Sequence, residues 1–166
     1  AVAESDLRPE AYSPAHAAGI WQFIESTGRH YGLRIDSYID QRRDFKMSTQ
    51  SALRFLESLN GQFKDWLLAM AAYNAGPGRI SGAIDSQGSR SYFDLKLPRE
   101  TERYIFRIAA IKLIMSDPGR FGADLSEKEK YPLYDLDTVT VAIKSKTFPI
   151  VHISEIAGRS YRHLTD

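Results

Sequence analysis

Eight consecutive residues, Trp66 to Tyr73, are apolar on nearly every side of the helix that they predict. Asp65 suits the N-cap position directly before this run, and Asn74, Ala75 and Gly76 provide its end. A helix without a polar face is stable only where other elements cover it on all sides. We therefore predict that this helix is buried inside a domain made mainly of helices.

Two segments that precede this run also have helical patterns. Residues 17–25 predict a short helix after a loop that is marked by Pro9 and Pro14. Ser48 suits the N-cap of a second helix. The apolar face of that helix consists of Ala52, Phe55, Leu56, Leu59 and Phe63.

Further helical signals follow the apolar run. The polar stretch 85–91 indicates an exposed loop, after which Pro98 suits a helix start and Pro118 with Gly119 ends that helix. Its apolar stripe consists of Tyr104, Ile108, Ile111 and Met115. These patterns predict about five or six helices in a first domain, residues 1–122.

The character of the sequence changes after Leu125. Residues 126–130 are charged, residues 138–143 predict a β-branched strand, and residues 150–157 predict a short helix that Gly158 stops. We expect residues 123–166 to form a small α/β appendage that docks on the helical domain or is cut short, because it is too small for a robust core of its own. The predicted fold class is thus mainly α with this appendage.

Composition excludes several classes of function. The 22 basic and 21 acidic residues give a net charge of +1, which does not favour nucleic acid or an anionic membrane as a partner. The absence of cysteine excludes a thiol nucleophile, a thiolate metal site and disulfides. The histidines lack metal-ligand spacing with one another and no phosphate-binding glycine loop is present, so we expect no metal and no organic cofactor. No membrane-spanning run and no signal peptide is present, so any targeting segment would lie outside this chain.

Four short motifs occur in order along the helical region. They are Glu4-Ser5 with Pro9; Ser13-Pro14 followed by Gly19-Ile20-Trp21-Gln22; Ala72-Tyr73-Asn74-Ala75-Gly76; and Leu97-Pro98-Arg99-Glu100-Thr101 with Tyr104. Each is weak alone, but in this order they resemble the lytic transglycosylases, whose SLT domain has a lysozyme-like fold. The membrane-bound lytic transglycosylase D type is especially similar, on Trp21, on Asp40-Gln41-Arg42-Arg43-Asp44 and on the Pro-Arg-Glu-Thr segment.

This resemblance implies a reaction. Glu4 would be the single general acid and then the base, cleaving the β-1,4 bond between N-acetylmuramic acid and N-acetylglucosamine in peptidoglycan and leaving a 1,6-anhydromuramoyl end. A carboxylic acid that an apolar pocket keeps neutral can supply the proton which such cleavage needs. The family also implies the periplasm or cell envelope as the location, with envelope or outer-membrane association through segments outside this chain. We expect a monomer.

The resemblance also implies a set of substrate-binding residues, namely Ser5, Gln22, Tyr73, Asn74, Glu100 and Tyr104. Local patterns alone favour other interpretations for some of them. Tyr73 could be a core residue and Asn74 a helix C-cap, while Glu100 suits the first turn of a helix without any function. Trp21 could belong to the core or stack on a sugar, and the sequence leaves both open.

Two positions depart from the family pattern. Leu7 replaces an aromatic residue, which alters the packing near Glu4. His16 replaces a glycine, and a left-handed backbone conformation there would cost a residue with a Cβ atom about 1 kcal/mol or more. We expect a local adjustment that keeps the site.

Two other functions remain open at this point. A lysozyme-like muramidase would use water as the acceptor and a second carboxylate across the cleft. A non-catalytic peptidoglycan-binding domain would keep the groove without turnover, although the retained Glu4 argues against it.

The tail has a partial likeness to a degenerate or truncated LysM-like repeat. The residues that carry it are Val139, Val141, Ile153, Ile156, Ala157, Gly158, Ser160, Tyr161 and Leu164. A terminal strand and helix that only cover the main core would explain the same pattern equally well.

Overall fold

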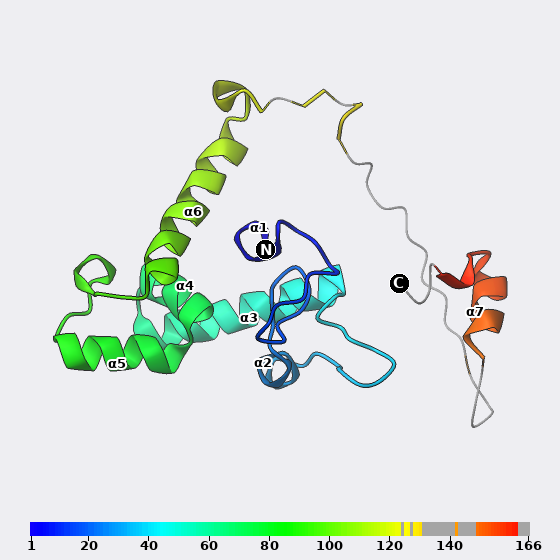
Figure 1. Ribbon diagram of the computed structural model, residues 1–166, viewed down its shortest axis with the longest axis horizontal. Helices are drawn as coiled ribbons and strands as arrows, with labels where there is room; N and C mark the ends of the chain where they lie inside the picture. The colour runs from blue at the N-terminus through cyan, green and yellow to red at the C-terminus, as the bar shows by residue number, and fades with distance from the viewer. Residues whose placement is uncertain (124, 127, 131–141, 143–148, 163–166) are drawn as a thin grey trace. The chain divides into compact units, whose positions relative to one another are not determined.

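The computed structural model describes residues 1–123, 125–126, 128–130, 142 and 149–162. The chain divides into two compact units, Ala1–Asp124 and Leu125–Asp166. The first unit contains α1 (Val2–Ser5), α2 (Glu25–His30), α3 (Phe45–Phe63), α4 (Trp66–Ala75), α5 (Pro77–Gln87) and α6 (Arg99–Ser116), with short 3-10 turns at Tyr92–Asp94 and Gly119–Phe121 (Figure 1). The mainly helical class predicted from sequence is confirmed.

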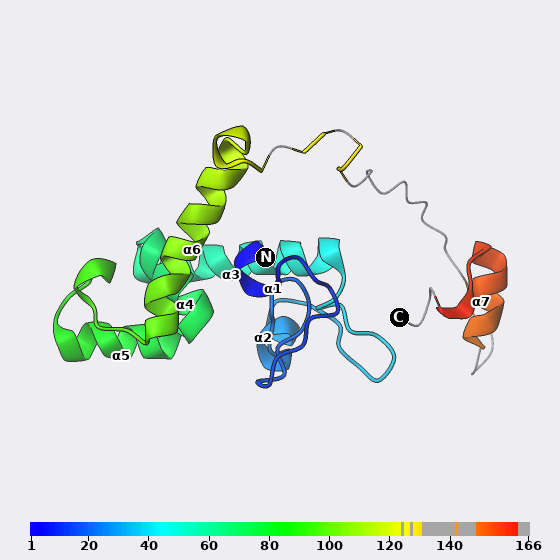
Figure 2. The ribbon, with the colours of Figure 1, turned by 45° about the horizontal axis from the view of Figure 1, so that its top comes forward.

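Helix α4 is the centre of the first unit. It contacts α3, α5 and α6, and these helices surround it in both ribbon views (Figures 1 and 2). Leu68, Ala69, Ala71 and Ala72 have no exposed surface, which confirms the predicted burial for this side of the helix. Trp66 at its start is 54% exposed, so the burial is not complete all round. The Asp65 side chain accepts a hydrogen bond from the Leu68 amide at 2.8 Å, so the predicted N-cap is confirmed.

The buried side chains form two clusters on either side of an aromatic seam. One cluster contains apolar residues of α3, α4, α5 and α6, and the other is formed by Phe23, Leu33, Ile35 and Ala52. Phe55 and Tyr73 pack against both clusters, with their ring centroids 5.1 Å apart. Burial of each large apolar side chain stabilises the fold by about 1.5–3 kcal/mol. The seam therefore places Tyr73 where the core meets the surface.

The predicted helix at residues 17–25 is wrong. The chain forms a loop here with isolated bridges between Tyr12 and Ala18 and between Ala18 and Phe23, and α2 begins only at Glu25. Gly19 and Gln22 have φ values of 78° and 50°, which interrupt any right-handed helix. The apolar pattern that predicts a helix therefore packs in a loop.

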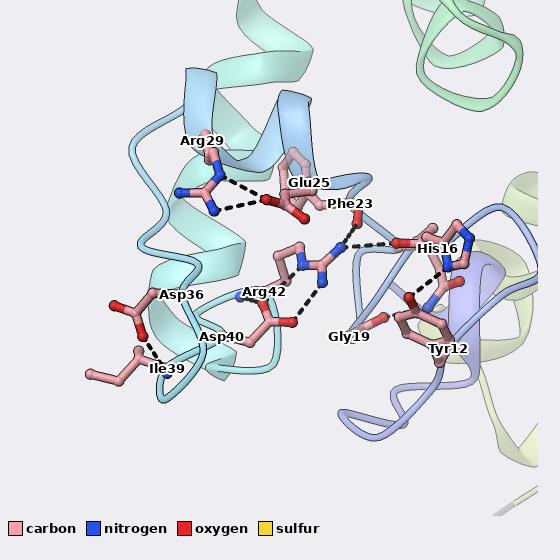
Figure 3. A network of polar contacts seen from close by, with 12 residues as sticks. Tyr12, His16, Gly19, Phe23, Glu25, Arg29, Asp36, Ile39, Asp40 and Arg42 are labelled. Atoms are coloured by element: carbon pink, nitrogen blue, oxygen red, sulfur yellow. Dashed lines mark hydrogen bonds and ion pairs between the residues drawn. The ribbon is translucent and has the colours of Figure 1, made fainter.

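Arg42 supplies the hydrogen bonds that this loop lacks. Its guanidinium donates to the carbonyl of His16 at 2.9 Å and to that of Phe23 at 3.1 Å (Figure 3). It also donates to both carboxylate oxygens of Asp40, at 2.8 and 2.6 Å. Burial alone would raise the pKa of Asp40, but the hydrogen bonds from Arg42 outweigh it and hold that pKa below its usual value.

The start of α3 also differs from the prediction. Asp44 is the N-cap, accepting a hydrogen bond from the Met47 amide at 2.7 Å, and Ser48 lies inside the helix with its hydroxyl on the Asp44 carbonyl. An ionised carboxylate is the better partner for exposed amides at a helix start. At 85–91, α5 continues to Gln87, so only the later part of the predicted loop is non-helical. The start of α6 after Pro98 and its end before Pro118 are confirmed.

Gly19 faces the backbone of the Arg42 segment. A Cβ atom at Gly19 would lie 1.8 Å from the Arg42 carbonyl oxygen. We expect Gly19→Ala to lower the free energy of unfolding by about 3 kcal/mol or more, because steric overlap adds to a positive φ that alone costs about 1–2 kcal/mol. Urea unfolding measures this, with Gly88→Ala as the control, since Gly88 has φ 68° and open space around it. Equal losses in the two variants would contradict the close approach at Gly19.

In the second unit, α7 (Ile150–Ala157) ends at Gly158, which has φ 60°, so this predicted helix is confirmed. The predicted strand 138–143 lies outside the described residues except for Ala142, and the LysM-like interpretation stays a prediction. Among the described helices, none has the length and apolar character needed to cross a membrane.

Candidate active site

Glu4 lies on the single turn of α1, which contacts α6. Its Oε1 accepts a hydrogen bond from the hydroxyl of Tyr104, a residue of α6 that is 100 positions away in the chain. On the other side of α1, the buried Ser5 hydroxyl donates to the Ile20 carbonyl at 3.1 Å. An exposed ion pair at 3.0 Å joins Asp6, just after α1, to Arg107 of α6. Contacts on several sides therefore hold this short turn in place.

The environment of Glu4 favours its neutral form. Burial raises the pKa of this carboxyl above its ordinary value, and the negative charge of Glu100 adds to the effect. The hydrogen bond from Tyr104 and the positive charge of Arg107 act in the opposite direction without cancelling it. Glu4 therefore keeps its proton to a higher pH than an exposed glutamate does, as a general acid must.

Glu4 lines a cleft with a volume of about 750 Å³. The walls come from the loop before α2, from α3, from the end of α4 and from the start of α6. The lining residues are Glu4, Ser13, Pro14, Ala15, Ala17, Gln22, Phe23, Ile24, Thr27, Phe55, Ala72, Tyr73, Asn74, Ala75, Gly76, Pro77 and Glu100. A concave site with mostly apolar walls and a few convergent polar groups is typical of ligand binding.

Tyr73 and Asn74 reach the cleft from the last turn of α4. The Tyr73 hydroxyl donates to the Trp21 carbonyl at 2.9 Å, and burial raises the pKa of this phenol well above its usual value, so it stays neutral. The Asn74 Oδ1 accepts from the Thr101 hydroxyl at 2.9 Å, which leaves the side-chain amide nitrogen as the donor available to a ligand. Both residues thus have a fixed orientation at the cleft wall.

The other predicted binding residues differ in their positions. Gln22 lines the cleft, and its Nε2 donates to the Gly19 and Ala11 carbonyls, so its amide oxygen is the group left to accept from a ligand. Glu100 is exposed at the start of α6 and also lines the cleft.

Ser5 is not among the lining residues, because its hydroxyl is buried against Ile20. Binding by Ser5 therefore has no support in this geometry, and its contact is a structural one. Trp21 donates from Nε1 to the Thr49 hydroxyl at 2.9 Å and packs edge-on against Tyr73, outside the cleft lining. This arrangement favours the core interpretation for Trp21.

The two departures from the family pattern are accommodated locally. Leu7 and His16 both adopt left-handed backbone conformations, with φ values of 62° and 60°. The His16 Nδ1 atom shares a hydrogen bond of 2.7 Å with the Tyr12 hydroxyl (Figure 3). Leu7 is exposed. The loop therefore keeps the glycine-type conformation at residue 16 despite the side chain, in place of the local adjustment that we expected there.

A second hollow of about 580 Å³ lies on the α6 side of Glu4, and sequence reasoning did not find it. It is lined by Ala3, Glu4, Asn74, Arg99, Glu100, Arg103, Tyr104 and Arg107. Glu4, Asn74 and Glu100 line both hollows. The spacing of the three arginines by four residues in a predicted helix was the signal that could have found this surface.

In the described ranges, no group of three or more His, Cys, Asp or Glu side chains is arranged to hold a metal ion.

Comparison with known proteins agrees with this geometry. Residues 1–95 match the family model of the Transglycosylase SLT domain. Two similar relatives are each named membrane-bound lytic murein transglycosylase D, one from Escherichia coli strain K12 and one from Escherichia coli O6:H1 strain CFT073. Each is 43% identical over 129 residues, which cover 75% of this chain and 28% of the relative. On the family match, the chain belongs to the transglycosylase SLT domain family.

Proposed function

We propose that this chain contains the catalytic domain of a peptidoglycan lytic transglycosylase. The observation that supports the proposal most is the half-buried Glu4, which lines a cleft together with Tyr73 and Asn74 and has a pKa that burial raises. The names of the two relatives support the same substrate class. Because the chain spans little more than a quarter of their length, the activity is proposed here for this domain alone.

In the proposed reaction, neutral Glu4 donates its proton to the oxygen of the β-1,4 bond after N-acetylmuramic acid, and that bond breaks. The N-acetyl group of the same sugar stabilises the cationic centre, while Tyr73 and Asn74 hold that group by hydrogen bonds. Glu4, now a carboxylate, accepts the proton of the sugar's 6-hydroxyl as this oxygen bonds to the anomeric carbon. The proton returns to Glu4, no water is consumed, and the product is a 1,6-anhydromuramoyl end.

A muramidase is the second candidate function, because of the position of Glu100. It is the other carboxyl group among the residues that line the cleft, and hydrolysis requires a second acid near the scissile bond. Treating released fragments with borohydride distinguishes the two reactions, because it reduces the free ends that hydrolysis leaves and does not change anhydro ends. Fragments that resist reduction support the transglycosylase, and reducible fragments support the muramidase.

We also propose a location and a domain role. The proposed substrate, glycan strands of peptidoglycan, implies the periplasm or cell envelope as the location of the enzyme. Residues 1–122 would form the catalytic domain, and residues 123–166 a separate small appendage. We expect the domain to act as a monomer.

The hydrogen bond from Tyr104 gives a prediction on pH. This bond lowers the pKa of Glu4 against the dominant effect of burial, so Tyr104→Phe should raise that pKa further. Activity that needs protonated Glu4 falls as the pH rises through this pKa, and the alkaline limb of kcat/KM should therefore move to higher pH. Tyr92→Phe is the control, because the Tyr92 hydroxyl bonds the carbonyls of Thr101 and Glu102 instead. An unmoved limb in Tyr104→Phe, or a move to lower pH, would refute this role of Tyr104.

A further inference from the structure

Three arginines form a stripe along α6 beside Glu4. Arg99, Arg103 and Arg107 follow one another at intervals of four residues, so they share one face of the helix over about 12 Å of its length. All three are exposed and line the second hollow. Glu4 lines this hollow and the cleft alike, so the two hollows adjoin at this residue.

The positive charge of the stripe is only partly compensated. Arg107 pairs with Asp6 at 3.0 Å. Neither Arg99 nor Arg103 has an ion-pair partner among the described residues, and the acids that line this hollow are Glu4 and Glu100. With Glu4 protonated, Glu100 is the one ionised acid among the residues that line this hollow. The hollow therefore has room and charge for an anion.

The position of Arg99 is unfavourable for the helix itself. Arg99 is the first residue of α6, where the helix dipole disfavours cations, and like charges four residues apart, as in Arg99 and Arg103, repel each other. No ion pair among the described residues offsets this at Arg99, so the helix itself does not account for a cation there.

We propose that Arg99 and Arg103 bind a carboxylate that the muramoyl sugars of the substrate carry, on the α6 side of Glu4. This inference rests on the proposed function, since it names the part of that substrate which the stripe recognises. The sugar backbone of the strand is neutral, and its carboxylates belong to the lactyl group of N-acetylmuramic acid or to the peptide stem attached there. A guanidinium group matches a carboxylate with two parallel hydrogen bonds. The stripe thus directs muramoyl-containing strands into the site.

The test measures binding without turnover. Calorimetry with soluble, stem-bearing glycan oligomers compares Glu4→Gln with the triple variant Glu4→Gln, Arg99→Gln and Arg103→Gln. We expect the triple variant to bind about tenfold more weakly at low salt, because two exposed charge contacts are lost, and the difference to shrink as salt is added. Glu4→Gln with Lys112→Gln is the control, since Lys112 lies on the same helix beside a different, apolar hollow. Circular dichroism checks that all variants fold.

A parallel titration uses oligomers from which an amidase has removed the stems. In a stem-bearing unit the lactyl carboxyl is part of the amide bond to the stem, and the amidase frees it as a carboxylate. An arginine effect with stem-bearing oligomers alone identifies the stem carboxylates as the ligand, and an effect with stem-free oligomers shows that the lactyl carboxylate is bound. Equal binding of both kinds of oligomer by the parent and the triple variant overturns the proposal. The outcome is separate from that of the proposed function, because the type of product end is measured on the wild type and the affinity is measured on variants that lack Glu4.

Discussion

Glu4→Gln is expected to lower the rate of glycan cleavage by a factor of about 10³, because a positioned general acid and base contributes about 10²–10⁴ to a rate. Glutamine keeps the shape of the side chain and its acceptor for the Tyr104 hydroxyl, but it cannot deliver a proton. Glycan affinity should therefore change by less than about threefold, within the range for a substitution that removes no binding group. Release of soluble fragments measures the rate, and calorimetry measures the affinity.

A measurement of stability shows whether Glu4→Gln loses activity because the acid is missing or because the protein unfolds. Burial raises the pKa of Glu4, so the folded state favours the protonated carboxyl. This contribution to stability is fully present below the pKa that Glu4 has in the unfolded chain and is lost as the pH rises through its folded pKa. Glutamine does not titrate, and Glu4→Gln should therefore be at least as stable as the wild type above that pH. Glu10→Gln, at an exposed acid after α1, is the matched control and should keep full activity. Cleavage by Glu4→Gln at the normal rate would show that another group is the acid.

Arg42→Met is expected to destabilise the first unit by about 3–5 kcal/mol, the usual cost of removing one partner of a buried ion pair. The Arg42 side chain is 7% exposed and Asp40 23% exposed. The substitution removes the guanidinium donor from the Asp40 carboxylate and from the His16 and Phe23 carbonyls (Figure 3). The Phe23 carbonyl then keeps only the Ala18 amide, and the Asp40 carboxylate keeps only the backbone amide of residue 42. Chemical denaturation measures the loss.

Arg34→Met is the matched control for this change. Arg34 pairs with Asp36 at 2.7 Å, but its side chain is 61% exposed, so the pair contributes at most about 1 kcal/mol. The loop before α2, which Arg42 supports, also carries Gln22, and Gln22 lines the cleft. A loosened loop should therefore raise KM in Arg42→Met, while Arg34→Met leaves KM unchanged. Similar stability losses in the two variants would contradict the role of Arg42 as the internal support of this loop.

The sequence predicts elements well where a local signal coincides with the tertiary structure. Asp65 and Gly76 bound a helix that is apolar nearly all round, and packing against three other helices buries most of it apart from Trp66 at its start. Residues 17–25 have helical spacing but form a loop, because Gly19 contacts the Arg42 backbone and the Arg42 side chain serves carbonyls that a helix would otherwise satisfy internally. Arg42 lies 19 or more positions along the chain from the carbonyls that it bonds. A pattern read over a short stretch of sequence therefore does not include this contact.

The candidate site likewise combines residues that sequence motifs predict with contacts that depend on the tertiary structure. The motifs predict that Glu4, Tyr73 and Asn74 belong to one site, and all three line the cleft. The contact of Tyr104 with Glu4, and that of Thr101 with Asn74, depend on how α6 crosses α1 and α4, which the sequence does not specify. The catalytic role of Glu4 and the binding roles of Tyr73 and Asn74 stay predictions.

The most direct test of the central claim is mass spectrometry of fragments released from purified peptidoglycan in water enriched in heavy oxygen, by the wild type and by Glu4→Gln. The proposed reaction consumes no water, so wild-type fragments should be one water lighter than hydrolysis products, carry no heavy oxygen and disappear with Glu4→Gln. Reducing-end fragments that contain heavy oxygen, or anhydro fragments that Glu4→Gln releases at the wild-type rate, would contradict it.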